Sequence, residues 1–191
     1  MTKDQLYNEL TKVSASRESR LTCAQLVKNN MSLFPDLIDI LFNVNDENSC
    51  HAAWVFEFVC ADYMYAIIPY LDTFTKKASK IHLDSAMRPV AKVCSQIATA
   101  YYSKENNTFK RLLKPEHKKR LVETCFDWMI NKHKVAVKVF AMETLFLFGQ
   151  DNAWIHKDLK QILEQDAPTQ SPAYKSRAKH ILIKMKKTSK S

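Results

Sequence analysis

Hydrophobic residues recur every three to four positions along most of this chain, and short polar stretches separate the periodic segments. Leu6, Leu10 and Val13 show this spacing near the start, and Leu121 and Cys125 show it later in the chain. A period of 3.6 residues predicts amphipathic helices. The pattern predicts helices over residues 2–13, 16–27, 32–42, 50–62, 65–77, 84–102, 115–130, 133–148, 154–165 and 173–184.

Residues at the ends of these segments support their boundaries. Thr2 and Gln5 have capping-box spacing, and Ser16 is suited to cap the second helix. Gly149 follows the segment 133–148 and is typical of a C-terminal helix stop. Residues 50–62 are apolar on nearly every side, which predicts a central helix covered by several others.

Several of the predicted helices share a local pattern in which a basic residue is followed three positions later by alanine within an apolar stripe. The copies are Arg88-x-x-Ala91, Lys138-x-x-Ala141 and Lys175-x-x-Ala178, with Cys50-x-x-Ala53 as a copy without the charge. This recurrence resembles the HEAT repeat family, in which antiparallel helix pairs stack into a solenoid. The resemblance implies an all-α, right-handed α-solenoid over residues 1–184, followed by a basic flexible tail at residues 185–191. An irregular helical bundle is the alternative.

Amino-acid composition further narrows the possible fold and function classes of the chain. The chain has 191 residues and one glycine, whereas β-rich folds, dinucleotide-binding folds and phosphate-binding loops need several. No apolar run reaches the 18 residues of a membrane span, and the N-terminus lacks the apolar segment of a secretory signal. The five cysteines form no C-x-x-C pair, which favours reduced thiols and a cytoplasmic location. The histidines and cysteines lack metal-ligand spacing, so neither a cofactor nor a metal is predicted.

Charge is unevenly distributed along the chain. Residues 1–95 carry 10 Lys and Arg against 11 Asp and Glu, a net of −1, whereas residues 96–191 carry 19 against 9, a net of +10. The densest basic cluster predicts contacts with nucleic acid or with an acidic partner, and Tyr101, Tyr102 and Phe109 lie close enough in sequence to stack on bases. Its members are Lys110, Arg111, Lys114, Lys118, Lys119 and Arg120.

Three acidic residues interrupt apolar runs: Glu57, Asp127 and Glu143. A buried carboxylate needs a partner, and its pKa rises if it lacks one, so such residues are candidate catalytic acids as well as candidate ion-pair partners. Trp54 lies one turn before Glu57, and Trp128 is adjacent to Asp127. In residue type this combination resembles HEAT-like alkylpurine DNA glycosylases, which use tryptophans and an acidic residue on a basic concave face.

The whole chain is also similar to small all-helical proteins often labelled adenylosuccinate lyase. The fragment Ser85–Lys92 resembles the lyase signature S-x-M-P-x-K-x-N-P, but Arg88 separates Met87 from Pro89 and no Asn-Pro follows. No catalytic residue is carried over from that family.

Three functions follow from these observations. A non-enzymatic helical scaffold that binds a protein partner ranks first, because solenoids usually act through extended surfaces. A nucleic-acid-binding module with glycosylase-like chemistry is the alternative, and a lyase ranks third. The sequence predicts no membrane association and leaves the oligomeric state open.

Overall fold

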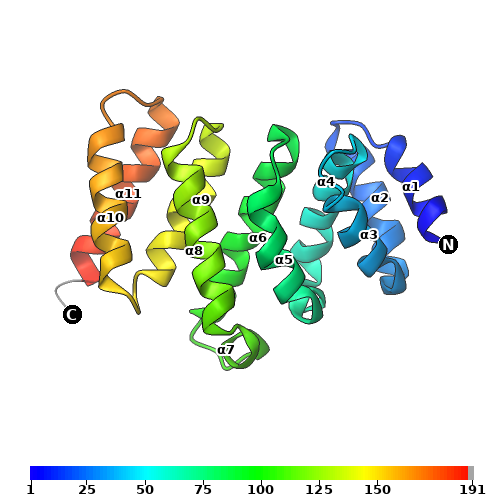
Figure 1. The fold of residues 1–191 in the computed structure, drawn as a ribbon, viewed down its shortest axis with the longest axis horizontal. Helices are drawn as coiled ribbons and strands as arrows, with labels where there is room; N and C mark the ends of the chain where they lie inside the picture. The colour runs from blue at the N-terminus through cyan, green and yellow to red at the C-terminus, as the bar shows by residue number, and fades with distance from the viewer. Residues whose placement is uncertain (189–191) are drawn as a thin grey trace. The chain divides into compact units, whose positions relative to one another are not determined.

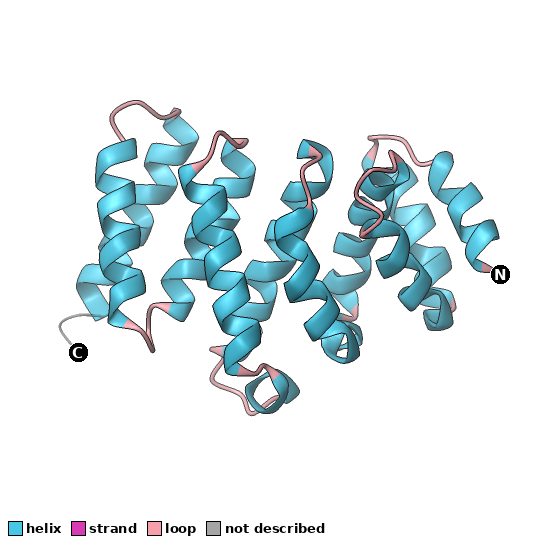
Figure 2. Ribbon diagram, in the orientation of Figure 1, coloured by secondary structure: helices cyan, strands magenta, loops and turns pink. Residues whose placement is uncertain are grey.

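The computed structural model describes residues 1–188, and in that part of the chain it contains helices and loops but no strand (Figure 1). Figure 2 shows the same arrangement coloured by secondary structure. The chain divides into two compact units, the first from Met1 to Val93 and the second from Cys94 onward. The all-α prediction is confirmed. The choice between a solenoid and an irregular bundle stays a prediction, as does a single domain over residues 1–184.

The first unit is built around α4 (Asn48–Asp62), which contacts α1 (Lys3–Thr11), α2 (Arg17–Asn29) and α3 (Phe34–Leu41). Most of the apolar side chains of α4 are buried, as expected for a helix covered on several sides. The unit also contains η1 (Met31–Leu33), η2 (Met64–Tyr70), α5 (Leu71–Lys77), η3 (Ala78–Lys80) and the first part of α6 (Asp84–Tyr101).

The second unit contains two helix pairs. Helix α8 (Pro115–Ile130) packs on α9 (Val135–Phe148), and α10 (Ala153–Asp166) packs on α11 (Pro172–Thr188). Helix α9 also contacts both helices of the second pair, and α8 contacts α10. The short α7 (Thr108–Leu112) and the end of α6 complete the unit.

The N-terminal helix boundaries follow from local hydrogen bonds. The backbone N–H of Gln5 donates to the Thr2 hydroxyl at 3.3 Å, and the Thr2 N–H donates to Gln5 Oε1 at 2.9 Å, so the predicted capping box is present. The Ser16 hydroxyl accepts from the Ser19 N–H at 3.1 Å and caps α2. Each bond satisfies a backbone group that the helix leaves without an internal partner.

Three expectations about the helices differ from the structure. The helix expected over residues 65–77 is divided into η2 and α5, with Pro69 in the 3-10 segment, because proline supplies no N–H to a continuous helix. Helix α7 lies in a stretch where no helix is expected. Helix α11 runs to Thr188 with Met185 buried, so residues 185–188 of the expected tail are helical, and residues 189–191 lie outside the described chain.

Candidate functional site

Glu57 of α4 is buried, and two cations of α6 neutralise its carboxylate. Arg88 Nη2 lies 2.6 Å from Glu57 Oε2, and Lys92 Nζ lies 2.8 Å from Glu57 Oε1. The Glu57 side chain is 4% exposed, whereas those of Arg88 and Lys92 are about a third exposed. The sequence expectation of an acid inside an apolar run is therefore realised as an ion pair between helices, with the cations toward solvent.

Trp54 lies one turn before Glu57 and, like Glu57, contacts α6. Its indole N–H donates to the backbone carbonyl of Ser85 at 2.9 Å. The guanidinium of Arg20 lies over the indole ring, 5.5 Å from its centroid, and that of Arg17 lies 5.8 Å from the Phe58 ring centroid. Trp54 and Phe58 are four residues apart, so they share one side of α4.

Glu143 of α9 is held in a similar way in the second unit. Arg177 Nη2 of α11 lies 2.8 Å from Glu143 Oε2, and the Ser95 hydroxyl donates to the same oxygen at 3.2 Å. Both Glu57 and Glu143 therefore pair with an arginine of a later helix. Ion pairing of this kind connects neighbouring helices and gives the carboxylates of Glu57 and Glu143 cationic partners.

Asp127 and Trp128 are neighbours in sequence but lie in different environments. The Trp128 side chain is buried, at 2% exposure, whereas Asp127 is exposed on the other side of α8. Consecutive helical residues are separated by about 100° around the axis, which accounts for this difference. The structure does not bring the Asp127 carboxylate and the Trp128 indole together at a common pocket.

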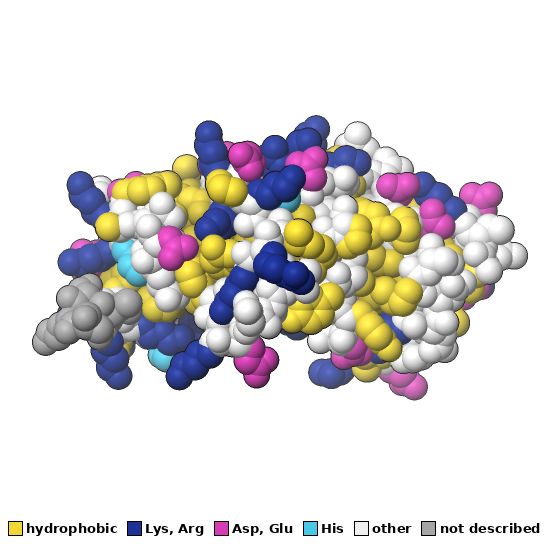
Figure 3. Space-filling model, turned by 90° about the horizontal axis from the view of Figure 1, so that it is seen from below, with side chains coloured by type: hydrophobic (Ala, Val, Ile, Leu, Met, Phe, Trp, Pro, Cys, Tyr) yellow, Lys and Arg dark blue, Asp and Glu magenta, His cyan; other side chains and the backbone are white. Residues whose placement is uncertain are grey.

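The predicted basic cluster is distributed over α7 and the first half of α8. Lys110, Arg111, Lys114 and Lys119 are exposed, and Lys118 and Arg120 are half-buried. Lys118 Nζ donates to the Tyr101 hydroxyl at 3.0 Å and lies 3.7 Å from Asp151 Oδ2. Lys119 lies 3.9 Å from Glu123. Nearby acids therefore offset part of this cluster. Figure 3 shows Lys and Arg side chains among hydrophobic ones on the face seen from below.

A groove between α8 and α10 was not predicted from the sequence. Its volume is about 410 Å³. It is lined by Pro115, Lys118, Lys119, Val122, Glu123, Phe148, Asn152, Trp154 and Ile155. We call this the α8/α10 groove.

Trp154 is the most prominent residue of the α8/α10 groove. It is 53% exposed, and its ring stacks on Phe126 with centroids 5.8 Å apart and planes at 25°. The buried stripe of α10 is Ile155, Leu159 and Leu163, so Trp154 lies one position outside it. A tryptophan just outside a clear apolar stripe is the sequence signal that could have identified the groove.

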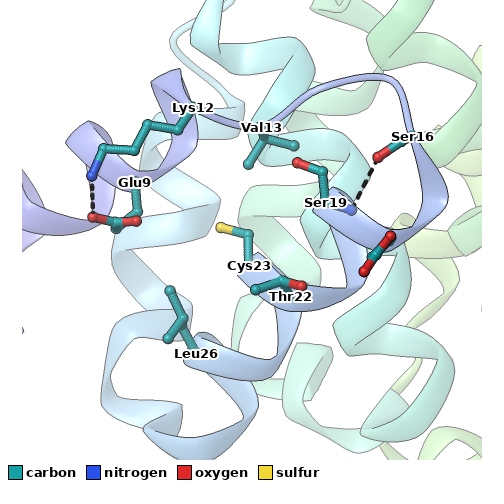
Figure 4. Close-up of a pocket in the computed structure, with 9 residues that line it drawn as sticks. Glu9, Lys12, Val13, Ser16, Ser19, Thr22, Cys23 and Leu26 are labelled. Atoms are coloured by element: carbon teal, nitrogen blue, oxygen red, sulfur yellow. Dashed lines mark hydrogen bonds and ion pairs between the residues drawn. The ribbon is translucent and has the colours of Figure 1, made fainter.

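A polar hollow of about 310 Å³ lies between the end of α1 and the start of α2 (Figure 4). Glu9 and Lys12 form an exposed ion pair at its edge, and the Cys23 thiol points toward its interior. Burial, with a smaller effect of the Glu9 charge, raises the pKa of Cys23 to about 11. The thiol is therefore protonated near neutral pH and is a poor nucleophile there.

Over residues 1–188, no group of three or more His, Cys, Asp and Glu side chains is arranged to hold a metal ion. In the same part of the chain, no helix alone is long and apolar enough to cross a membrane. Helix α4 and the segment Met64–Lys80 meet that criterion only as a pair, bent by 116°.

Comparison with models of known protein families, with curated proteins and with solved structures finds no match to this chain. Its function is therefore inferred from the geometry of its own side chains.

Proposed function

We propose that this chain is a non-enzymatic, HEAT-like interaction module, and that the α8/α10 groove binds an acidic segment of a partner protein. The observation that carries the proposal is Trp154, which is half exposed at the edge of an apolar groove. Tryptophan is enriched among the residues that dominate protein–protein binding energy, because it combines a large apolar area with few rotatable bonds.

The groove has the features of a small anchoring site. Stacking on Phe126 restrains the Trp154 ring, so little conformational entropy remains to be lost on binding. Val122, Phe148 and Ile155 supply the apolar lining. An aromatic or large aliphatic side chain of the partner would displace water from this lining.

The charge around the groove favours an acidic partner. Residues 96–191 carry a net charge of +10, and of the two lysines in the groove lining Lys118 lies 3.7 Å from Asp151, whereas Lys119 lies 3.9 Å from Glu123 and extends into solvent. Lys119 is the most exposed of these charges, with 76% of its side chain accessible. Positive potential of this kind increases the association rate of acidic partners and selects against basic ones.

Selection of peptides on the intact protein tests the proposal. A random 12-residue peptide library is panned on the full chain, and an enriched peptide is synthesised with a fluorescein label and titrated by anisotropy. We expect enriched peptides to combine an aromatic or aliphatic residue with Asp or Glu. Trp154→Ala should weaken binding by about tenfold or more, and Lys119→Glu by a smaller factor.

Ile183→Ala provides the matched control, because Ile183 is also an exposed apolar residue of the second unit, at 45% exposure. It should leave the affinity within about twofold. Thermal unfolding of each variant verifies that the fold is retained. Peptides that bind wild type and Trp154→Ala equally, or a library that yields no acidic apolar peptide, would contradict the proposal.

A further inference from the structure

Four cationic side chains lie along the two sides of α4 in the first unit. Arg17 and Arg20 of α2 lie over the rings of Phe58 and Trp54, and Arg88 and Lys92 of α6 pair with Glu57. Glu57 and Phe58 follow Trp54 by three and four residues, so each is a neighbour of Trp54 on the surface of this helix. We call these four cations the unit 1 cationic surface.

Carboxylates compensate the positive charge of this surface only in part. Glu57 is the carboxylate that contacts it, and it neutralises one charge between Arg88 and Lys92. Arg17 and Arg20 form no ion pair within the described chain. Glu18 and Asp84, on α2 and α6, are exposed carboxylates at the helix starts. Four cations against the carboxylates of Glu57, Glu18 and Asp84 leave a net charge of about +1 around this face.

The arginines of α2 lie where they work against helix stability. Ser16 caps the helix, so Arg17 is its first residue and Arg20 is still within or just after its first turn. The N-terminal end of a helix is the positive end of its dipole, which disfavours cations. Arg20 is further fixed by bonds to the carbonyls of Ala15 and Ser16, at 2.7 and 3.1 Å. These bonds of Arg20 stabilise the turn before α2, so it is Arg17 whose place at this end helix stability does not explain.

We propose that the unit 1 cationic surface binds the phosphodiester backbone of a nucleic acid. Guanidinium groups held against aromatic rings are oriented in advance, and their remaining N–H groups match phosphate oxygens. The positive end of α2 and the two cations of α6 add to the same field. This inference is independent of the α8/α10 groove, and it places the binding in the half of the chain whose net charge is −1.

Fluorescence anisotropy with the full chain tests the inference. The probes are a labelled 20-nucleotide oligothymidylate and a labelled 20-base-pair DNA duplex, each titrated at several salt concentrations. Arg17→Gln/Arg20→Gln should weaken binding by about tenfold and reduce the slope of log K against log salt. Two lost phosphate contacts correspond to a slope change of about 1.4 for a single strand and about 1.8 for a duplex. The probe that the wild-type protein binds more tightly at the same salt concentration is the preferred form.

The matched control removes the same charge from the more basic unit. Lys175→Gln/Lys179→Gln changes two exposed cations of α11, outside the predicted basic cluster, and should alter binding by less than about twofold. Arg17→Lys/Arg20→Lys keeps the charge and should restore the salt slope, although not the full affinity. Circular dichroism and thermal unfolding show whether the variants remain folded.

Three outcomes would overturn the inference. One is the absence of binding to either probe at low salt. Another is an equal loss of affinity in the α11 control, which would indicate binding by net charge alone. The last is binding to vesicles containing phosphatidylserine, lost in Arg17→Gln/Arg20→Gln, together with no binding to nucleic acid, since the surface would then recognise a membrane.

Discussion

Gly149 ends α9, and the space around its Cα explains why a glycine is required there. Its backbone is in the right-handed helical region, with φ −66° and ψ −14°, so the left-handed conformation typical of a glycine stop is not used. A Cβ at this position would overlap the ring of His156. The His156 ring cannot easily move aside for this Cβ, because it stacks on Phe146 and its Nε2 lies 2.7 Å from the Phe146 carbonyl oxygen.

We therefore predict that Gly149→Ala destabilises the protein by about 1–3 kcal/mol, the usual cost of overpacking. Urea unfolding at neutral pH measures the change. In the double variant Gly149→Ala/His156→Ala the overlap is absent, so the cost of adding the alanine should nearly vanish. An alanine that costs the same with and without the His156 ring would show that the ring is not the obstacle.

Glu57 provides a second prediction at the residue scale. Glu57→Ala should lower the free energy of unfolding by about 2 kcal/mol, because it leaves Arg88 and Lys92 close together without their carboxylate. The loss is smaller than for a fully buried pair, since both cations reach solvent. Glu57→Gln keeps the shape and an acceptor oxygen, so it should cost less. Chemical denaturation compares the three proteins, and a Glu57→Ala variant as stable as wild type would contradict the assignment.

Helix α2 shows opposite electrostatic effects at its two ends. Arg17 is its first residue, whereas Lys28 is in its last turn and pairs with Asp62 at 2.7 Å. Relief of the dipole repulsion in Arg17→Gln should contribute about 0.3–1 kcal/mol of stabilisation at low salt, set against the lost contact with the Phe58 ring, and Lys28→Gln should destabilise the protein by a similar amount. Thermal unfolding at low salt and at 0.5 M salt measures both effects, which should shrink with screening. Salt-dependent changes of the same sign in both variants would exclude the dipole as their cause.

The helices that could be predicted from the sequence are those with strong periodicity and a local cap. The capping box of α1, the Ser16 cap of α2 and the start of α8 at Pro115 all depend on residues within one turn, so the sequence contains their cause. The break between η2 and α5 and the short helix α7 were not predicted. The secondary structure of such weakly periodic segments depends on tertiary packing rather than on local helix propensity.

The candidate sites were predictable in part, for the same reason. The ion pairing of Glu57 was one expected outcome for an acid in an apolar run, although its partners on α6 depend on how two helices pack. Arg17 and Arg20 were not singled out, because residues 1–95 have a net charge of −1. Their positions over Trp54 and Phe58 follow from the packing of α2 against α4.

At the scale of the whole molecule, net charge along the sequence is a poor guide to where cations gather. The second unit has most of the positive charge, but Lys118 and Lys119 lie near Asp151 and Glu123. The first unit is nearly neutral, yet cations of α2 and α6 gather beside α4 and outnumber the carboxylates there. Two units with different surfaces are consistent with a module that contacts two partners, an acidic peptide in one unit and a phosphodiester in the other.

Both units also contain buried thiols, and these make the stability of the whole protein sensitive to alkaline pH. Burial raises the pKa of Cys23 to about 11 and that of Cys125 to about 12, and it raises the pKa of Cys60 and Cys94 well above 9. The unfolded chain loses these protons near pH 9, whereas the folded chain keeps them. Their contribution to stability is therefore complete below pH 9 and is lost as the pH rises through the folded-state pKa values.

We predict that the free energy of unfolding falls steeply between pH 8 and 10.5, and that Cys125 contributes about 2 kcal/mol of this fall. Urea unfolding of wild type and Cys125→Ala at both pH values, with a reducing agent present, measures that share. Cys125→Ala should be less stable at pH 8 because of the lost volume, but its stability should fall less with pH. Lysine and tyrosine titration affects both proteins alike and cancels in the difference. An unchanged pH dependence in Cys125→Ala would mean that this thiol ionises as readily in the folded chain as in the unfolded one.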